Sequence, residues 1–558
     1  MKRKTNKKGM VLIISLLLIT GILILVGAYF SNILSESRYA RVEKAVIQAQ
    51  NLADAGAANA YAELRIRSGV NLNANMLNVT NGALLTAYVT NNDPLGFLRD
   101  YGTNAPNPAF TVAGGEARLT INTMAGLNTG VNGSYAATLV VTAGANPINN
   151  GSVAYRFFYN YRIESIGTSN NFLTAIQKSV RLAQGSFFVD ITRNNFARFA
   201  LFTNNHTMQN GGLVWFTGNT QFSGPVSTNT RFSFAYNPQF SGGVVTQVDN
   251  LANYYNNGNT KSLANDHNGT IDVPNFSNGF QRNSPVNTLP TSVTQTEMRD
   301  QALGTLSVPS SNGVYVPNDG SCLTGGIYIR GDSNITLGSS GDSAVYTINR
   351  GGNISTITAN YAANTTTVVD GSGTNTYCGL PKGAGGEGVL IYSASSINAI
   401  SGTVNHNSNL TVAANNNAVI SSHIRYEQYN TSPSLNASGY SNVLGLLSWN
   451  GNVEISSGAP NNIEIHGVVM APNGVFTVQN YDSGAPKGIA TLLGGVITDN
   501  YGAFGQFSGT TNTHGYGRNF VYDARMISGT APPYFPYLTN YSATPTWTTR
   551  PIWQDMGG

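Results

Sequence analysis

The chain has 558 residues, of which 10% are charged, 41% are hydrophobic and 62 are glycine. This apolar content is too high for a disordered chain, and the many Gly and Asn residues favour short strands joined by tight turns. The formal charge of +4 includes five basic residues within positions 1–9, so the remainder carries −1. This balance excludes a general electrostatic argument for nucleic-acid binding.

The N-terminal segment has the composition of a membrane anchor. Residues 1–9 are basic and end in Gly9, and residues 10–30 carry no charge. As a helix, residues 10–30 would span about 31 Å, enough for the ~30 Å hydrocarbon core of a bilayer. The flanking lysines should stay in the cytoplasm and leave the remainder outside. A cleavable signal peptide fits less well, because the run is too long and no A-x-A-like site follows.

The helical pattern continues beyond the apolar run. Residues 31–67 contain no proline, and their apolar residues recur mostly at steps of three or four, which predicts one helix over 10–68. Gly69 is a plausible C-cap. A face of small residues suits close packing against another element; it consists of Ala49, Ala53, Gly56, Ala57 and Ala60.

These features resemble a known family. A short basic leader ending in Gly9, followed by a long helix that is half apolar and half amphipathic, resembles the class III leader and N-terminal helix of type IV pilins. Residues 9–17 look most like the PilX-type minor pilins. The resemblance implies cleavage after Gly9 by a prepilin peptidase and methylation of the Met10 amine. It also implies, as partners, other minor and major pilins and the inner-membrane assembly platform.

One position departs from the family pattern. The fifth residue of the mature chain is usually Glu in type IV pilins, where it neutralises the N-terminal amine of a neighbouring subunit, and here it is Ile14. A buried unpaired charge is costly in lipid. We therefore expect an inner-membrane protein that, after assembly, lies at the pilus tip on the cell surface. The alternative is a simple single-pass anchor.

The next region predicts a small antiparallel sheet, within a domain over 69–195. Strands are expected at 117–123, 136–142, 153–163 and 176–182. The third alternates most clearly, with Tyr155, Phe157, Tyr159, Tyr161 and Ile163 on one face. A long helix followed by four strands indicates an α+β fold.

Internal repeats follow. The motif at 219–226 recurs at 237–244. A second pattern begins at Gly445, returns at Gly467 and Gly495, and has looser copies at Gly326 and Gly388. Repeat lengths of roughly 20 residues suit a β-solenoid, predicted over 196–515, with a β-sandwich or propeller as the alternative. Residues 516–558 are interpreted as a cap or return segment that covers a solenoid end.

The middle and tail also resemble the domain of unknown function that follows PilX-type leaders in large pilin-like proteins. Residues 199–202, 224–229 and 520–525 carry this resemblance. The length and architecture are similar to competence tip pilins of the ComZ type, in which a large β-solenoid rides on a pilin core.

We find no catalytic motif. The six histidines are scattered, and residues 382–388 are rich in glycine but lack the G-K-[ST] of a phosphate loop. Glu454 and Glu464 are a pair of carboxylates on predicted strands. This location does not exclude a catalytic role, but most such pairs belong to solvent-exposed strand faces. We expect no enzyme activity, no cofactor and no metal.

Two further features invite functional interpretation. Basic residues interleaved with aromatics suit DNA, although we favour the simpler interpretation of an ordinary strand surface; they are Arg156, Arg162, Lys178, Arg181, Arg193 and Arg198. Cys322 and Cys378, 56 positions apart, could form a disulfide in an oxidising compartment or be two buried small side chains.

Three functions therefore remain open. The first is a minor or tip pilin that supports pilus assembly and captures DNA for natural transformation. The second is an adhesive tip pilin that binds a surface or glycan. The third is a membrane-tethered solenoid enzyme that acts on carbohydrate.

Overall fold

The computed structural model describes residues 7–68, 79–101, 110–122, 133–150, 154–169, 177–218, 220–256, 259–263, 274–508, 511–527, 529–548 and 552–556. The chain divides into two compact units. The first comprises Met1–Arg193 with Asn540–Gly558, and the second comprises Asn194–Thr539. Most of the expected leader and the expected cap Gly69 lie outside the described residues.

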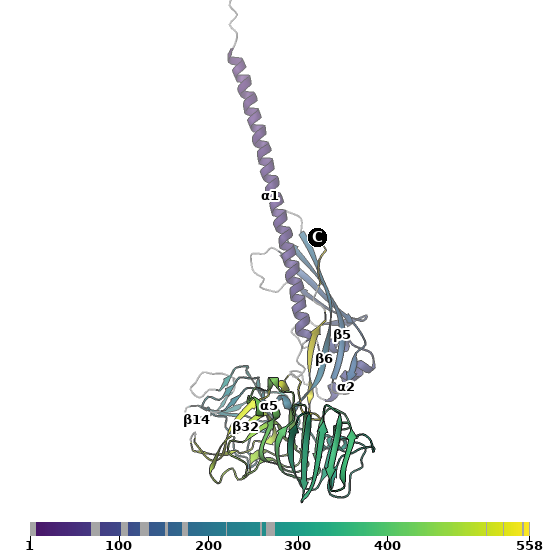
Figure 1. The fold of residues 1–558 in the computed structure, drawn as a ribbon. Helices are drawn as coiled ribbons and strands as arrows, with labels where there is room; N and C mark the ends of the chain where they lie inside the picture. Colours follow the sequence, from purple (N-terminus) through teal and green to yellow (C-terminus); the bar gives the residue numbers. More distant parts are fainter. Residues whose placement is uncertain are drawn as a thin grey trace, which may run out of the picture. The chain divides into compact units, whose positions relative to one another are not determined.

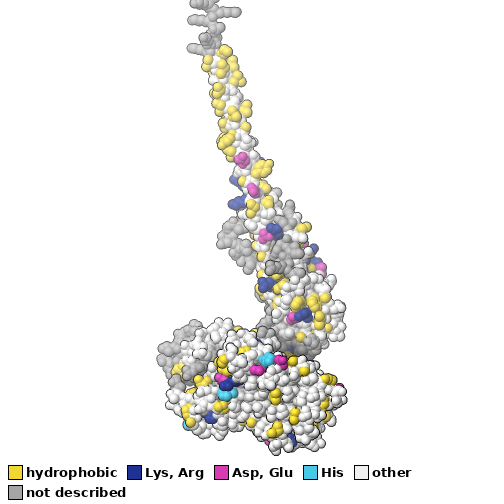
Figure 2. Space-filling model, viewed as in Figure 1, with side chains coloured by type: hydrophobic (Ala, Val, Ile, Leu, Met, Phe, Trp, Pro, Cys, Tyr) yellow, Lys and Arg dark blue, Asp and Glu magenta, His cyan; other side chains and the backbone are white. Residues whose placement is uncertain are grey.

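The first unit begins with one long helix, α1 (Lys7–Ser68). Its N-terminal half is exposed and apolar, and within residues 9–68 Figure 2 shows charged side chains only beyond this stretch. In its C-terminal half, the predicted small-residue face is buried: Ala49, Ala53, Ala57 and Ala60 have no exposed surface. Helix formation follows from an apolar, proline-free sequence, and burial of one face supplies the packing energy.

An antiparallel sheet lies against this half of α1 (Figure 1). Its main strands run in the order β1-β2-β3-β5-β6-β35, with β4 beside β5 and β36 beside β6. Their bounds are Thr111–Ala113, Glu116–Asn122, Gly133–Ala143, Ala154–Ser169, Gln177–Asn195, Tyr537–Trp547, Ile148–Asn150 (β4) and Ile552–Asp555 (β36). Strand β5 alternates buried and less buried residues, as its sequence predicts. The inward-facing residues include Tyr155, Phe157, Tyr159, Tyr161 and Ile163.

Two short helices and the C-terminal strand complete the core of this unit. Helices α2 (Val79–Thr90) and α3 (Gly96–Tyr101) contribute Tyr88 and Phe97, whose rings lie 6.4 and 6.1 Å from that of Phe157. Strand β35 brings Trp547 to within 4.7 Å of the Phe187 ring, measured between centroids. The end of the chain therefore joins the sheet of the first unit.

The second unit is a large mixed β-sheet domain built around two parallel ladders. The first ladder runs β18-β24-β26-β28-β30-β32-β7-β9-β12-β16. The bounds of these strands, in that order, are Ile327–Arg330, Val389–Ser393, Asn409–Ala414, Val443–Ser448, Glu464–Ala471, Pro486–Asn500, Leu201–Asn205, Val226–Thr228, Val245–Gln247 and Phe280–Gln281.

The second ladder runs β19-β25-β27-β29-β31. Its strands are Ser333–Ser340, Ile397–Val404, Ala418–Tyr426, Val453–Ile455 and Phe476–Val478. Antiparallel strands extend it from β19 through β20 (Ser343–Arg350), β21 (Asn353–Asn360), β22 (Thr365–Asp370) and β23 (Gly373–Cys378). Antiparallel pairing also joins β17 (Gly313–Tyr315) to β18 and β33 (Gly505–Ser508) to β34 (Thr511–Tyr522), which itself pairs in parallel with β32.

The two ladders differ in how they are covered. Strands β24 and β28 are buried at every position, whereas β29 and β31 alternate. Parallel strands buried on both faces read as continuous apolar runs, and this explains sequences such as Val-Leu-Gly-Leu-Leu-Ser at 443–448. Helix α4 (Ser292–Leu303), capped by Thr291, packs on β18 and β24.

The tail covers the same ladder before it leaves the unit. Pro532 and Phe535 lie against Gly445 of β28, and Pro533 lies against Gly388 just before β24. Strands β24 and β28 are the second and fourth of the ten strands of the ladder. Residues 532–535 therefore cover part of the ladder at β24 and β28.

The shorter repeat also occupies neighbouring strands. Strands β8 (Gln221–Phe222) and β11 (Gln239–Phe240) pair in parallel in the register that the repeat predicts, with Phe222 opposite Phe240, and β15 (Asn275–Phe276) follows. The rings of Phe222 and Phe240 stack at 6.0 Å, and those of Phe240 and Phe276 at 5.3 Å. Strands β10 (Ser233–Ala235), β13 (Ala252–Asn256) and β14 (Asn259–Leu263) form a further small sheet, and the remaining helix is α5 (Glu427–Thr431). Among the described residues of 200–515, α4 is the only helix longer than five residues.

Candidate functional site

The exposed half of α1 is the most extensive apolar surface described. Met10 is 69% exposed and Ile14 is 53% exposed, and the apolar side chains continue to Phe30. The serine and the threonine in this stretch bond back to the helix: Ser15 donates to the Leu12 carbonyl at 2.9 Å, and Thr20 donates to the Leu16 carbonyl. These hydroxyls therefore need no partner from outside, and this surface suits lipid or the apolar helices of other subunits.

The other half of α1 is held to the sheet by close backbone contact and by polar pairs. A Cβ on Gly56 would overlap the side chains of Ser165 on β5 and Tyr135 on β3, so α1 packs closely on both strands at this point. Asn59 donates to the Tyr135 hydroxyl at 3.0 Å, and Arg181 of β6 pairs with Asp54 at 2.6 Å. This half of the helix is thereby fixed on the sheet.

The six basic residues proposed for DNA contact do not form one surface. Three of them lie on the outer face of the sheet, because their positions along β5 and β6 alternate with those of the inward-facing residues. These three are Arg156, Arg162 and Lys178. Arg181 lies on the opposite face, where it meets Asp54 of α1. By alternation in β6, Arg193 lies on that inner face as well, beside Ile191.

Acidic neighbours offset several of these charges. Arg156 binds Asp190 at 2.6 Å and lies 4.2 Å from the centre of the Phe188 ring, and Arg162 lies 3.5 Å from Glu164. Arg198 belongs to the second unit, where burial lowers its pKa. The sequence surplus of positive charge therefore does not become a continuous basic patch.

Cys322 and Cys378 are joined in a disulfide, with their Cα atoms 4.4 Å apart. Backbone hydrogen bonds flank the bond, since the Leu323 amide donates to the Cys378 carbonyl at 2.9 Å and the Cys378 amide to the Ser321 carbonyl at 3.0 Å. The sequence did not distinguish this disulfide from two separate buried side chains.

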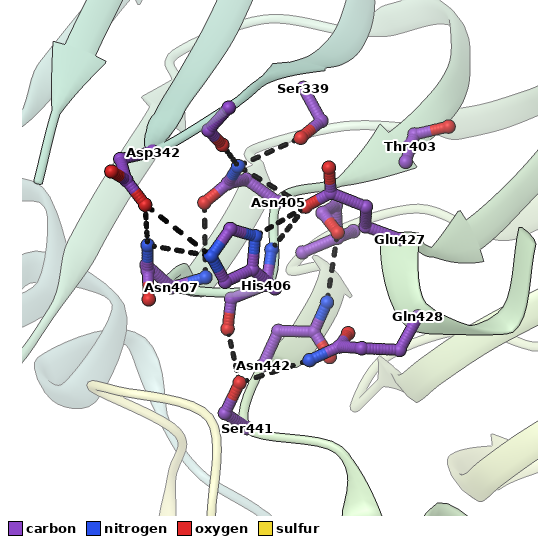
Figure 3. Close-up of polar contacts among 12 residues, drawn as sticks. Ser339, Asp342, Thr403, Asn405, His406, Asn407, Glu427, Gln428, Ser441 and Asn442 are labelled. Carbon is purple, nitrogen blue, oxygen red and sulfur yellow. Dashed lines mark hydrogen bonds and ion pairs between the residues drawn. The ribbon is translucent and has the colours of Figure 1, made fainter. Parts of the chain in front are cut away.

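A polar cluster surrounds His406 in the second unit (Figure 3). The Glu427 carboxylate, at the start of α5, accepts hydrogen bonds from the His406 backbone amide at 2.8 Å and lies 2.7 Å from its ring Nδ1. Asp342 lies 3.6 Å from the ring Nε2. Burial tends to raise the pKa of Glu427, but hydrogen bonds from Ser339 and His406 outweigh it and hold this pKa below its usual value.

Asn405 connects this cluster to the turn between β19 and β20. Its side-chain amide donates to the Ser339 hydroxyl at 2.7 Å and to the Gly341 carbonyl at 2.8 Å. Ser441 donates to the His406 carbonyl and accepts from Gln428 at 3.0 Å. The cluster therefore joins four separate chain segments. Within the described part of the chain, no three His, Cys, Asp or Glu side chains are grouped to hold a metal ion.

Comparisons with known proteins give limited matches. Residues 155–248 match a family described as a domain of unknown function (DUF4900). This range includes residues 199–202 and 224–229, two of the three segments that carried the resemblance of the head, whereas residues 520–525 lie outside it. No curated protein sequence matches the chain.

The chain is similar to the crystal structure of the competence-associated pilin ComZ from Thermus thermophilus. Sequence identity is 14% and the TM-score is 0.30, with 92% of this chain and 97% of that chain covered. A long N-terminal apolar helix such as α1 is typical of type IV pilins.

Proposed function

We propose that this chain is a minor subunit of the type IV pilin kind, which displays a large β-rich head outside the cell. The observation that carries the proposal is α1: one continuous helix with an exposed apolar half and a half fixed to an antiparallel sheet. The exposed half would lie in the inner membrane before assembly and among the helices of other pilins afterwards.

We further propose that the second unit is wound as a β-solenoid. The support is the register of successive parallel strands: Gly445 of β28 pairs with Val468 of β30, and Val468 pairs in turn with Gly495 of β32. Because successive parallel strands lie only about 20–30 residues apart in sequence, the chain must travel back to the start of the previous strand before each new one, as it does in the coils of a solenoid. The parallel β8–β11 pair, in which Gln221 lies opposite Gln239, supports the same winding.

The tip of the filament is the proposed position of the subunit. Ile14 occupies the place of the Glu that neutralises the N-terminal amine of a neighbour in type IV pilins. A repeating fibre of this chain would bury each amine without that partner, whereas a terminal subunit would avoid most of the penalty. The partners would be other minor and major pilins, the prepilin peptidase and the assembly platform.

DNA capture stays a prediction for this subunit. Three of its six candidate residues, Arg156, Arg162 and Arg181, have carboxylate partners, and Arg198 lies in the other unit. An adhesive role for the head is the alternative.

Maturation tests the pilin assignment. Mass spectrometry of the membrane fraction should find a methylated N-terminus at Met10, and replacing Gly9 with a bulky residue should block the cleavage. An intact N-terminus in cells with an active prepilin peptidase would contradict the proposal. Gold labelling of the head on filaments should mark their ends, and uniform labelling along the shaft would exclude tip placement.

A further inference from the structure

A hollow of about 460 Å³ lies on the second unit where β8 meets β34. Its walls include five aromatic side chains: Trp215, Phe222, Tyr501, Phe507 and Phe520. Phe507 is 48% exposed and Ile489 at the rim is 49% exposed, although the core of this unit is well packed. The volume is within the range of about 300–1,000 Å³ that is usual for ligand sites.

Arg518 is the single charged side chain in this hollow. It donates to the Tyr501 hydroxyl, and its guanidinium carbon lies 5.0 Å from the centre of the Tyr501 ring and 6.0 Å from that of Phe504. Among the described residues, no carboxylate lies within ion-pair distance of Arg518. By contrast, Arg425 pairs with Glu464 and Arg525 with Asp523 in the same unit. Arg518 is thus held in place by aromatic groups with its charge not neutralised.

A second hollow of about 470 Å³ shares Tyr501 with the first. Side-chain amides line it, among them Asn210, Asn452 and Gln479, together with one carboxylate, Glu454. Glu454 accepts from Gln479 at 2.7 Å and from Asn452 at 3.2 Å, so these amides are oriented. We refer to the two hollows, which share Tyr501, as the groove. The first hollow contributes aromatic faces to it and the second contributes amide groups.

We infer that this groove binds an extended polysaccharide that carries uronate groups. The C–H faces of pyranose rings pack on aromatic side chains, and sugar hydroxyls pair with amide groups. A carboxylate of the sugar would provide the missing partner of Arg518, because Arg binds carboxylates in a planar, bidentate geometry. The inference goes beyond the proposed pilin role and does not depend on it.

The first hollow offers too few basic side chains for DNA. DNA binding depends on neutralising several phosphates, and the first hollow supplies only Arg518. A uronate-bearing polysaccharide fits one arginine among aromatic and amide groups, because a single carboxylate can pair with Arg518 while neighbouring sugar rings lie on the aromatic faces.

The test uses the full chain purified in detergent and three immobilised polymers: xanthan, hyaluronan and polygalacturonate. Each is also used in a carboxyl-reduced form, which differs only in the loss of the carboxylate. Retention on at least one native polymer is expected. Arg518→Gln should weaken that binding about tenfold or more, the loss expected for one charge-assisted hydrogen bond, and should leave binding to the reduced polymer unchanged.

Phe507→Ala should weaken binding to both forms, because it removes a stacking face. Ile354→Ala is the matched control, since Ile354 is a similarly exposed side chain (55%) on β21 of the same unit. Circular dichroism of each variant would establish that it folds.

Retention on none of the polymers would overturn the inference, as would equal binding by the Arg518 and Ile354 variants. Tight binding of single-stranded DNA that displaces the polysaccharide would assign the groove to nucleic acid instead. Because detergent-purified chain needs no maturation or assembly, failure here is distinguishable from failure of the pilin proposal.

Discussion

The backbone carbonyl of Ala49 on α1 lies so close to Gly167 on β5 that no side chain larger than hydrogen fits between them. Gly167 sits opposite the small-residue face of α1, and the amide of Ala53 is the next atom that a methyl group would meet. This contact sets the distance between the helix and the sheet.

Replacing Gly167 with alanine should therefore loosen α1 from β5. An inserted methyl group that meets backbone must move the helix, and overpacking of this kind costs about 1–3 kcal/mol. Hydrogen exchange of residues 45–60 in detergent should become faster. Gly144→Ala is the milder comparison, because its added Cβ would come within 3.3 Å of the β5 backbone, whereas at Gly167 the added Cβ would overlap the Ala49 carbonyl. Equal protection in both variants would contradict the described contact.

Replacing Ile14 with glutamate should increase the number of copies per filament. A carboxylate at this position would restore the partner of a neighbouring N-terminal amine, and breaking such a buried pair costs about 3–5 kcal/mol. Quantitative immunoblotting of sheared filaments, with Ile14→Gln as the uncharged control, measures the change. An unchanged copy number would mean that the head, and not Ile14, limits incorporation.

Removing the Cys322–Cys378 disulfide should destabilise the second unit. The bond links residues separated by 56 positions, and closing a loop of this size stabilises a fold by about 4 kcal/mol in the chain-entropy account. The double variant Cys322→Ala/Cys378→Ala should unfold at lower denaturant concentration than the wild type, and reductant should affect only the wild type. A wild type insensitive to strong reductant in denaturant would show that the bond does not form.

Glu427 should stabilise the fold at neutral pH and lose this effect in acid. Because its pKa is lowered on folding from the usual 4.5, its contribution is complete above that value and disappears as the pH falls through the lowered pKa. Glu427→Gln should cost about 2 kcal/mol at pH 7, the worth of hydrogen bonds to a charged group. The cost should vanish at low pH, as denaturant unfolding would measure. Glu297→Gln, an exposed substitution on α4, should have little effect at any pH.

His206 should make stability depend on pH in a higher range. Its ring is buried between Phe216 and Phe232, at 4.6 and 4.7 Å, and burial lowers its pKa from 6.5 to about 3. The folded state keeps His206 neutral while the unfolded state takes up a proton, so stability should fall by about 2 kcal/mol between pH 7 and pH 5. His206→Phe keeps the ring contacts and should flatten this dependence. An identical pH profile in the variant would contradict a buried neutral histidine.

The long helix could be predicted from the sequence because its determinants are local. An uncharged run of bilayer length, the absence of proline and a face of small residues specify α1 without reference to any distant segment. The alternation of Tyr155 to Ile163 likewise identifies β5 and its inner face, because side chains of a strand point alternately to its two sides.

The register of the first ladder depended on tertiary structure. The sequence pattern aligns Gly445 with Gly467, but in the structure Gly445 lies opposite Val468, and Gly467 lies opposite Gly494. These strands are buried on both faces, so a shift of one residue exchanges one apolar side chain for another. Strands that are exposed on one face carry a polar–apolar alternation that opposes such a shift.

The same reason applies to the candidate sites. The six basic residues are near in sequence, yet strand alternation divides five of them between two faces, and the partner of Arg181 is Asp54, on α1. The groove beside Arg518 brings Trp215 together with Tyr501 and Phe507 from a distant segment, and no short motif indicates it. Sequence alone determined the anchor, the helix and the alternating strand, which depend on neighbours along the chain. Which charges are neutralised and which aromatic rings meet depended on contacts between distant segments, which only the folded chain specifies.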